Sequence, residues 1–280
     1  MHSPLVLTGR GGSGTRMLSE IARHFDVFLG NEINKTGDST EWADLIYDYA
    51  ISKFEKGDRV GLLKRRKFSR QIAGMSKKLA ADGLAGNHRH WGWKLPETIL
   101  VIPEIHARFP DMKLVHLVRH PVSISLRGVH LTSRISHRVG RRVVAAAYRR
   151  YGRPVERMKT DEIHLHNAYS WKYQVASAME YGRNELPAGN YIELKFEDLC
   201  SRPEAEEARI GEFIGEAPRI DSETIAINPR PRKPEFWSRD KIEEVWEVCA
   251  DVATELGYTL DDIAELIPAE TDPGTDGKPD

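Results

Sequence analysis

The sequence contains little cysteine, no long hydrophobic run and almost no net charge. Its 280 residues include two cysteines, Cys200 and Cys249, which excludes a disulfide-rich secreted scaffold and indicates reduced thiols. No apolar stretch approaches the roughly 20 residues that cross a bilayer, and no apolar signal segment opens the chain. A formal net charge of -1 gives no general attraction to nucleic acid or to a membrane surface. These absences predict a cytoplasmic protein without a membrane span.

Apolar segments of strand length alternate with segments of helical periodicity, which is typical of an α/β fold with a central parallel sheet flanked by helices. The pattern predicts strands near 4–8, 26–30, 90–95, 113–118 and 190–196. It predicts helices near 14–25, 39–56, 67–84, 98–109, 121–135, 139–158, 161–184, 203–215 and 239–256.

The length and the 40% hydrophobic content are sufficient for one large core, so we expect a single domain over residues 1–267. Residues 268–280 are small and polar, which predicts a disordered tail.

A glycine-rich turn joins the first predicted strand to the first predicted helix. Gly9 and Gly14 have the spacing of the nucleoside-triphosphate P-loop. However, Thr15 replaces the lysine of that loop, and Arg16 replaces its magnesium-binding hydroxyl. Backbone N–H groups and the start of the helix would still hold a phosphate or sulfate group. The predicted anion loop consists of Arg10, Gly11, Gly12, Ser13, Gly14, Thr15 and Arg16.

The dinucleotide-binding fingerprint is a rival interpretation of the same turn. Gly9, Gly11 and Gly14 fit that pattern, and Glu32 follows at about the distance of a ribose-binding carboxylate. Close packing of a helix on its strand is a further, purely structural reason for such glycines.

A second apolar strand, residues 113–118, runs into Arg119, His120 and Pro121. Proline suits the first turn of a helix, so Arg119 would lie at the carboxyl edge of a parallel sheet, where open α/β sheets bind ligands. Arginine can also pair with a nearby carboxylate. Taken with the glycine-rich loop, Arg119 indicates a second anion contact.

Four blocks in this order resemble the sulfotransferase superfamily, whose members take a sulfuryl group from 3′-phosphoadenosine 5′-phosphosulfate (PAPS). Residues 9–16 resemble the 5′-phosphosulfate loop of the family, and residues 117–121 resemble its 3′-phosphate turn, usually Arg-Asp-Pro. Residues 93–110 contain segments similar to its Lys-x-Pro and Phe-Pro motifs, and residues 191–203 to its late strand with Glu-Asp-Leu and proline. The resemblance implies a P-loop NTPase-like sulfotransferase fold and metal-independent in-line transfer.

The chain departs from the family pattern at two positions. Gly12 stands where the family commonly has Lys or Arg, so the cation would come from Arg10, Arg16 or Lys94. Arg127 stands where the family has a serine that helps to hold the 3′-phosphate. Arg127 itself, or the hydroxyl of Ser123 or Ser125, would then contact that phosphate.

Sulfuryl transfer needs cations aimed at the developing charge and a group that accepts the proton of the acceptor. Arg10 and Lys94 are the predicted electrostatic residues. Glu32 is the first candidate for the base, because related families place a carboxylate after the second strand, and His90 is the second. No histidine or cysteine spacing indicates a metal site.

Ten basic residues and one acidic residue occur from Arg127 to Lys159. Apolar residues recur among them at helical spacing, which predicts an amphipathic helix within a basic lid over about 127–184. The charges would form a solvated face, cover the donor or attract an anionic acceptor. The resemblance also suggests that Arg232 and Lys233, in a late basic loop, contact the 3′-phosphate.

The sequence therefore predicts a PAPS-dependent sulfotransferase that acts on a small-molecule or carbohydrate hydroxyl or amine. Phenol, lipid and peptide tyrosine acceptors also stay open, because acceptor pockets are built from variable loops. Two alternatives remain: a divergent P-loop nucleotide phosphotransferase, and a non-catalytic nucleotide or nucleic-acid binder that uses the basic segment 127–159. The sequence does not indicate an oligomeric state.

Overall fold

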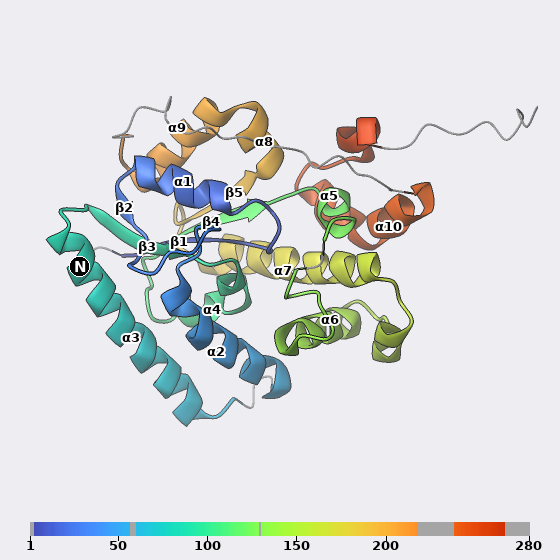
Figure 1. The fold of residues 1–280 in the computed structure, drawn as a ribbon, viewed down its shortest axis with the longest axis horizontal. Coiled ribbons are helices and arrows are strands. Elements are labelled where there is room, and N and C mark those ends of the chain that lie inside the picture. The colour runs from blue at the N-terminus through green and yellow to red at the C-terminus, as the bar shows by residue number, and fades with distance from the viewer. Residues whose placement is uncertain (1–2, 57–59, 129, 218–237, 267–280) are drawn as a thin grey trace, which may run out of the picture.

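The core of the protein is a five-stranded sheet in which every strand is parallel to its neighbours (Figure 1). The computed structural model describes residues 3–56, 60–128, 130–217 and 238–266. The strand order is β2-β3-β1-β4-β5, which confirms the predicted α/β class and all five predicted strands. The strands are β1 (Leu5–Gly9), β2 (Val27–Phe28), β3 (His90–Lys94), β4 (Lys113–Val118) and β5 (Tyr191–Lys195).

The register aligns the carboxyl ends of the three central strands. Leu7 of β1 lies opposite Lys94 of β3 and Val115 of β4. Gly9, the last residue of β1, lies opposite Leu117 of β4. The chain segments that leave these strands therefore emerge side by side at one edge of the sheet.

Helices cover both faces of the sheet, because its strands are apolar on both sides. Figure 1 shows α1, α8 and α9 on one face and α2, α4, α6 and α7 on the other. Each face of the sheet belongs to its own apolar cluster. Leu7 and Val115 pack in the cluster on one face, and Val6 and Leu114 pack in the cluster on the other. The helices on the two faces are α1 (Arg16–His24), α2 (Ala43–Lys56), α3 (Leu62–Ala85), α4 (Ile102–His106), α6 (Arg138–Arg150), α7 (Ile163–Glu185), α8 (Phe196–Ser201) and α9 (Pro203–Ile214).

Shorter elements complete the described chain. Helix α10 packs on α5 and α7, and its buried residues extend the core past the end of β4. These elements are η1 (Thr40–Trp42), η3 (Pro96–Leu100), α5 (Pro121–Ser125), η4 (Val155–Lys159), α10 (Arg239–Glu255) and η6 (Leu260–Leu266).

Three predicted helices differ from the structure. The helix expected over 98–109 consists of two short helices, η3 and α4, and ends at His106. The helix expected over 121–135 ends at Ser125, where Gly128 and several β-branched residues disfavour continuation. The helix expected over 139–158 ends at Arg150, because Gly152 has a φ of 71° and Pro154 follows it. The basic segment is therefore one helix flanked by turns, and the turn before that helix reaches the anion loop.

Several predictions lie outside the described residues. They concern Arg232, Lys233 and the tail 268–280, and they stay predictions together with the single domain over 1–267. No helix in the described part of the chain is long and apolar enough to cross a membrane.

Candidate active site

The turn between β1 and α1 has a backbone that favours glycine. Gly12 and Gly14 have φ values of 92° and 90°, in the left-handed region. A Cβ on Gly9 would lie 2.4 Å from the carbonyl oxygen of Leu117. Across the described ranges, no protein group accepts from the N–H groups of Gly12, Gly14 or Thr15. These N–H groups at the start of α1 are therefore available to an anion.

Arg10 connects this loop to two distant segments through hydrogen bonds. Its side chain is fully buried, and its guanidinium donates to the carbonyl oxygen of Gly11 and to Asn167 Oδ1, both at 2.8 Å. It also donates to Ser133 Oγ. Burial lowers the pKa of Arg10 to about 10, so the side chain remains a cation. None of the described carboxylates pairs with it, so none of them neutralises its charge.

Lys94, the last residue of β3, is buried against the segment that follows β2. Its Nζ donates to Asp38 Oδ1 at 2.5 Å and to the carbonyl oxygen of Thr36 at 2.8 Å. Burial lowers the pKa of Lys94, although Asp38 opposes this change. Burial alone would raise the pKa of Asp38, but hydrogen bonds from Lys94 and Thr36 lower it overall. The ammonium group at this strand end is thus neutralised by Asp38.

We expect Asp38→Asn to lower the free energy of unfolding by about 2 kcal/mol at neutral pH, because it removes the charge that Lys94 faces. The folded pKa of Asp38 is below its ordinary value, so its stabilisation is complete above about pH 4 and is lost as the pH falls further. Urea unfolding at several pH values measures the difference. Asp48→Asn, at an exposed position of α2, is the control and should change little. A difference that does not shrink at low pH would contradict this explanation.

His130 lies directly against the anion loop. A Cβ on Gly11 would be 2.1 Å from the imidazole ring, so only glycine fits beside it. The Thr132 N–H is 3.3 Å from Nδ1, which therefore carries the lone pair, and Nε2 lies 3.5 Å from Glu97 Oε1. Burial, with a contribution from Arg10, lowers the pKa of His130 to about 3. Burial also raises the pKa of Glu97. A neutral histidine is thus oriented by a buried carboxyl group.

Arg119 follows β4 at the same edge of the sheet. Its guanidinium carbon lies 4.0 Å from the centre of the Phe196 ring, and its carbonyl oxygen accepts from the Trp171 indole at 3.0 Å. Burial and then the nearby Arg127 lower the pKa of Arg119 to about 10. Among the residues that the structure describes, its buried Nε has no hydrogen-bond partner, and Ser123 follows in the first turn of α5. Two close cations and a hydroxyl group form a second candidate anion contact.

The comparison with known families decides between the alternatives. A family profile described as "Sulfotransferase family" matches residues 4–221. The chain belongs to the sulfotransferase family. This confirms the predicted family and the predicted transferase activity, and it favours neither a phosphotransferase nor a non-catalytic binder.

Solved sulfotransferase structures have a similar fold. The sulfotransferase domain of the Synechococcus PCC 7002 olefin synthase is 14% identical with a TM-score of 0.50, and the match covers 92% of this chain and 97% of that one. A sulfotransferase from Mycobacterium avium is 11% identical with a TM-score of 0.50, covering 91% of this chain and 76% of that one. No curated protein matches the sequence. At these identities the likeness establishes the fold alone.

The two predicted bases of this sulfotransferase lie away from the loop or on the surface. His90 begins β3, four residues before Lys94, so about 13 Å of strand separates it from the carboxyl edge. Its Nε2 lies 3.2 Å from Glu216. This position argues against His90 as the proton acceptor. Glu32 is exposed in the segment after β2, where its carbonyl oxygen accepts from the Thr40 N–H at 2.8 Å.

Arg16 also differs from the other predicted cations. Its side chain is 67% exposed and lies 3.8 Å from Glu20 along the surface of α1. In the residues that the structure describes, no group of three His, Cys, Asp or Glu side chains is arranged for a metal ion.

Sequence reasoning missed His130, Glu97 and Asp38. Each reaches the site through a contact between distant segments, and no local pattern marks such contacts. The sequence contained one signal for a residue such as Asp38, because a lysine at the end of a buried strand needs a counter-charge.

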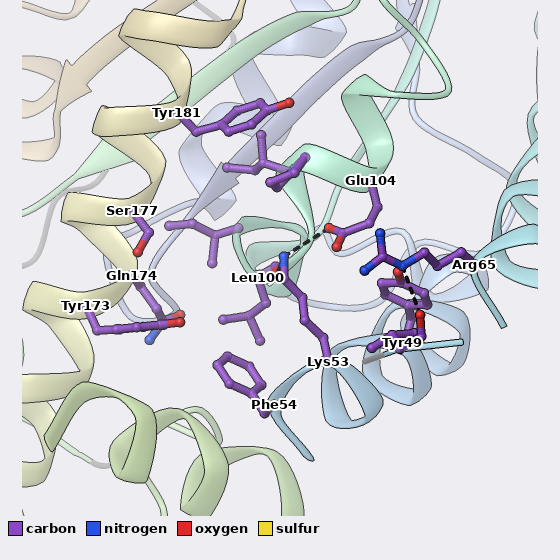
Figure 2. Close-up of a pocket in the computed structure, with 14 residues that line it drawn as sticks. Tyr49, Lys53, Phe54, Arg65, Leu100, Glu104, Tyr173, Gln174, Ser177 and Tyr181 are labelled. Carbon is purple, nitrogen blue, oxygen red and sulfur yellow. Dashed lines mark hydrogen bonds and ion pairs between the residues drawn. The ribbon is translucent and has the colours of Figure 1, made fainter. Parts of the chain in front are cut away.

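A separate cavity of about 390 Å³ lies between α2, α4 and α7 of the sulfotransferase (Figure 2). Lys53 Nζ is 3.0 Å from Glu104 Oε2 in its wall. Gln174 also lines it, and the Nε2 of Gln174 donates to Thr132 Oγ1 at 3.2 Å. Thr132 Oγ1 lies 3.1 Å from His130 Nδ1, so hydrogen bonds connect this cavity with the ring beside the loop.

Proposed function

We propose that this sulfotransferase uses PAPS as its donor and binds it across the ends of β1 and β4. The observation that carries the proposal is the pair of anion contacts at the same edge of the sheet. One is the loop of unpaired N–H groups after β1, and the other is Arg119 with Arg127 after β4. PAPS has anionic groups at both ends of its nucleotide, at the 5′-phosphosulfate and the 3′-phosphate. β1 and β4 are adjacent, so one nucleotide can reach both contacts.

The loop would hold the 5′-phosphosulfate. Its contacts are the N–H groups of Gly12, Gly14 and Thr15, with Arg10 behind them and Arg16 able to approach from the surface. Arg119 and Arg127 would hold the 3′-phosphate, and Ser123 would add a hydroxyl. Arg232 and Lys233 remain further candidates for this phosphate. The unpaired buried Nε of Arg119 fits this assignment, because a buried donor without a partner is costly.

The transfer itself needs fixed positive charge where negative charge develops. The acceptor oxygen bonds to sulfur while the bond from sulfur to the phosphate oxygen breaks, and charge grows on that leaving oxygen. Arg10 and the loop amides would stabilise this charge. Lys94 would contribute once an anionic group competes with Asp38 for its ammonium.

His130 is the proton acceptor that best fits the geometry. Its Cε1 and Nε2 side contacts Gly11, and Nε2–H interacts with Glu97. Nδ1 could take the hydroxyl proton where the acceptor replaces the Thr132 contacts to this atom at 3.1 and 3.3 Å. A carboxylate that orients a histidine in this way is a common arrangement for proton transfer. Glu32 remains the alternative, at a more exposed position.

Isothermal titration calorimetry with adenosine 3′,5′-bisphosphate in EDTA tests the donor site, with ATP and adenosine 5′-phosphate for comparison. The proposal expects tight binding that needs no metal and depends on the 3′-phosphate. A preference for magnesium-ATP, or no binding of the bisphosphate, would refute it.

Arg119→Ala should weaken binding of adenosine 3′,5′-bisphosphate by about 10-fold to 150-fold, because it removes a charge-assisted contact of roughly 1.5–3 kcal/mol. Calorimetry measures the change. Arg183→Ala is the control, because Arg183 pairs with Glu193 on the surface away from the loop. Equal affinity in Arg119→Ala and the parent protein would remove Arg119 from the donor site.

A further inference from the structure

An open groove of about 660 Å³ lies between α6, the end of α2 and η4. Figure 1 shows α2 and α6 on the same face of the sheet. The size is suited to a small organic molecule. Its apolar lining consists of Phe54, Ile135, Ala145, Val155 and Met158.

The rim of the groove is cationic. Arg141, Arg142, Arg149 and Lys159 line it, against a single carboxylate, Glu55. Glu55 pairs with Arg142. In the described parts of the chain, the other three cations form no ion pair or side-chain hydrogen bond. The groove therefore combines an apolar floor with unneutralised positive charge.

From Arg141 onward, the cations of the basic segment that do not line the groove all form ion pairs with described residues. Arg150, on the far side of α6, pairs with Glu180 at 2.9 Å. Arg153 and Arg157 both pair with Asp161, at 2.5 and 3.3 Å. If these cations served only to keep the protein soluble, we would not expect a difference in ion pairing between those at the groove and those elsewhere. This difference in ion pairing indicates that the groove binds an anion.

One end of the groove is connected to the anion loop by a short stretch of chain. Ile135 follows the turn that contains His130 and Ser133, and these two residues contact Gly11 and Arg10. The start of α6 packs on the same turn, because a Cβ on Gly140 would lie 2.3 Å from the carbonyl oxygen of Leu131. From there the rim extends about 12 Å along α6, from Arg141 to Arg149. A molecule in the groove would therefore have one end among the cations, and its other end would have to extend past the turn 130–133 to reach the anion loop.

We propose that this groove binds the acceptor, and that the acceptor is an amphiphile with an apolar chain, an anionic group at one end and a hydroxyl at the other. The assignment rests on the proposed function. The hydroxyl oxygen would form a bond to the donor sulfur, the bond from sulfur to the phosphate oxygen would break, and the hydroxyl proton would pass to the His130 imidazole. Arg141, Arg149 and Lys159 select the anion, and the apolar floor selects the chain.

Calorimetry with ω-hydroxylauric acid and the neutral dodecanediol tests the groove directly, without the donor. The parent protein should bind the hydroxy acid about tenfold more tightly than the diol, and less so in high salt, because exposed charges are screened. In the variant Arg141→Glu/Arg149→Glu this preference should disappear. Lys159→Glu, which alters the rim from a different element, should reduce it as well.

The control is Arg66→Glu/Arg70→Glu, which makes the same change of net charge on exposed residues of α3. It should keep the preference for the hydroxy acid. Binding of adenosine 3′,5′-bisphosphate is measured in every variant, so failure of the donor site is recorded separately from failure of the groove. Equal binding of acid and diol, or a preference that survives in Arg141→Glu/Arg149→Glu, would overturn the proposal.

Discussion

His130→Asn should lower turnover by about 10²-fold to 10⁴-fold while adenosine 3′,5′-bisphosphate still binds with nearly unchanged affinity. The imidazole lies against Gly11 but is not expected to hold the phosphate groups, so its loss affects the proton and not the donor. Turnover is measured as bisphosphate release from PAPS in the presence of an acceptor, and affinity by calorimetry.

Two further variants separate the candidates for the proton acceptor. Glu97→Gln should lower turnover less than His130→Asn, and the two changes should not add, because the residues act as one unit. Glu32→Gln should leave turnover nearly unchanged. A large loss in Glu32→Gln with a normal His130→Asn would return the role to the exposed carboxylate after β2.

The pH dependence gives an independent check on the same residue. Burial and Arg10 lower the pKa of His130 to about 3, so the free protein keeps a neutral imidazole throughout the range from about pH 5 to 8. Its lone pair is lost only as the pH falls toward that pKa. The value of kcat/KM should therefore show no loss in this range that is due to His130. An acid limb near the ordinary histidine pKa that disappears in His130→Asn would contradict this.

Much of the fold and half of the site follow from local sequence patterns. The strand predicted over 113–118 forms as β4 at the same bounds, because a continuous apolar run fits a buried parallel strand. The anion loop is likewise local, since its glycines and the start of α1 are adjacent in the chain. The helix predicted over 121–135 failed because its apolar spacing continued past Ser125 although its residues disfavour a helix.

The remaining parts of the site depend on contacts that no local pattern encodes. Arg10 donates a hydrogen bond to Asn167, 157 residues away. His130, in the connection from β4 to β5, faces Glu97, in the connection from β3 to β4. His90 shows that closeness in sequence does not ensure closeness in the site. It is close to Lys94 in sequence, yet the strand between them carries it to the other edge of the sheet. Local sequence patterns predicted where the strands end. Only the packed structure shows which side chains from distant segments come together at those strand ends.

Gly14→Ala should reduce the affinity for adenosine 3′,5′-bisphosphate by about 10²-fold and destabilise the fold by roughly 1–3 kcal/mol. Its φ of 90° is unfavourable for alanine, and its Cβ would lie 2.3 Å from the Phe196 ring. That ring also stacks on Arg119 at 4.0 Å. The added methyl group therefore disturbs the anion loop and the second anion contact together. Calorimetry and urea unfolding measure the two effects.

Gly215→Ala separates backbone strain from the clash, because Gly215 has a φ of 87° and an added methyl group would meet none of the described residues within 4 Å. It should cost about 1 kcal/mol of stability and leave the affinity unchanged. In Gly14→Ala/Phe196→Ala the clash is removed, so part of the stability should return. The affinity should not return, because Arg119 has then lost the ring that orients it. Full recovery of binding in the double variant would mean that Phe196 only fills space, and that Arg119 needs no support from α8.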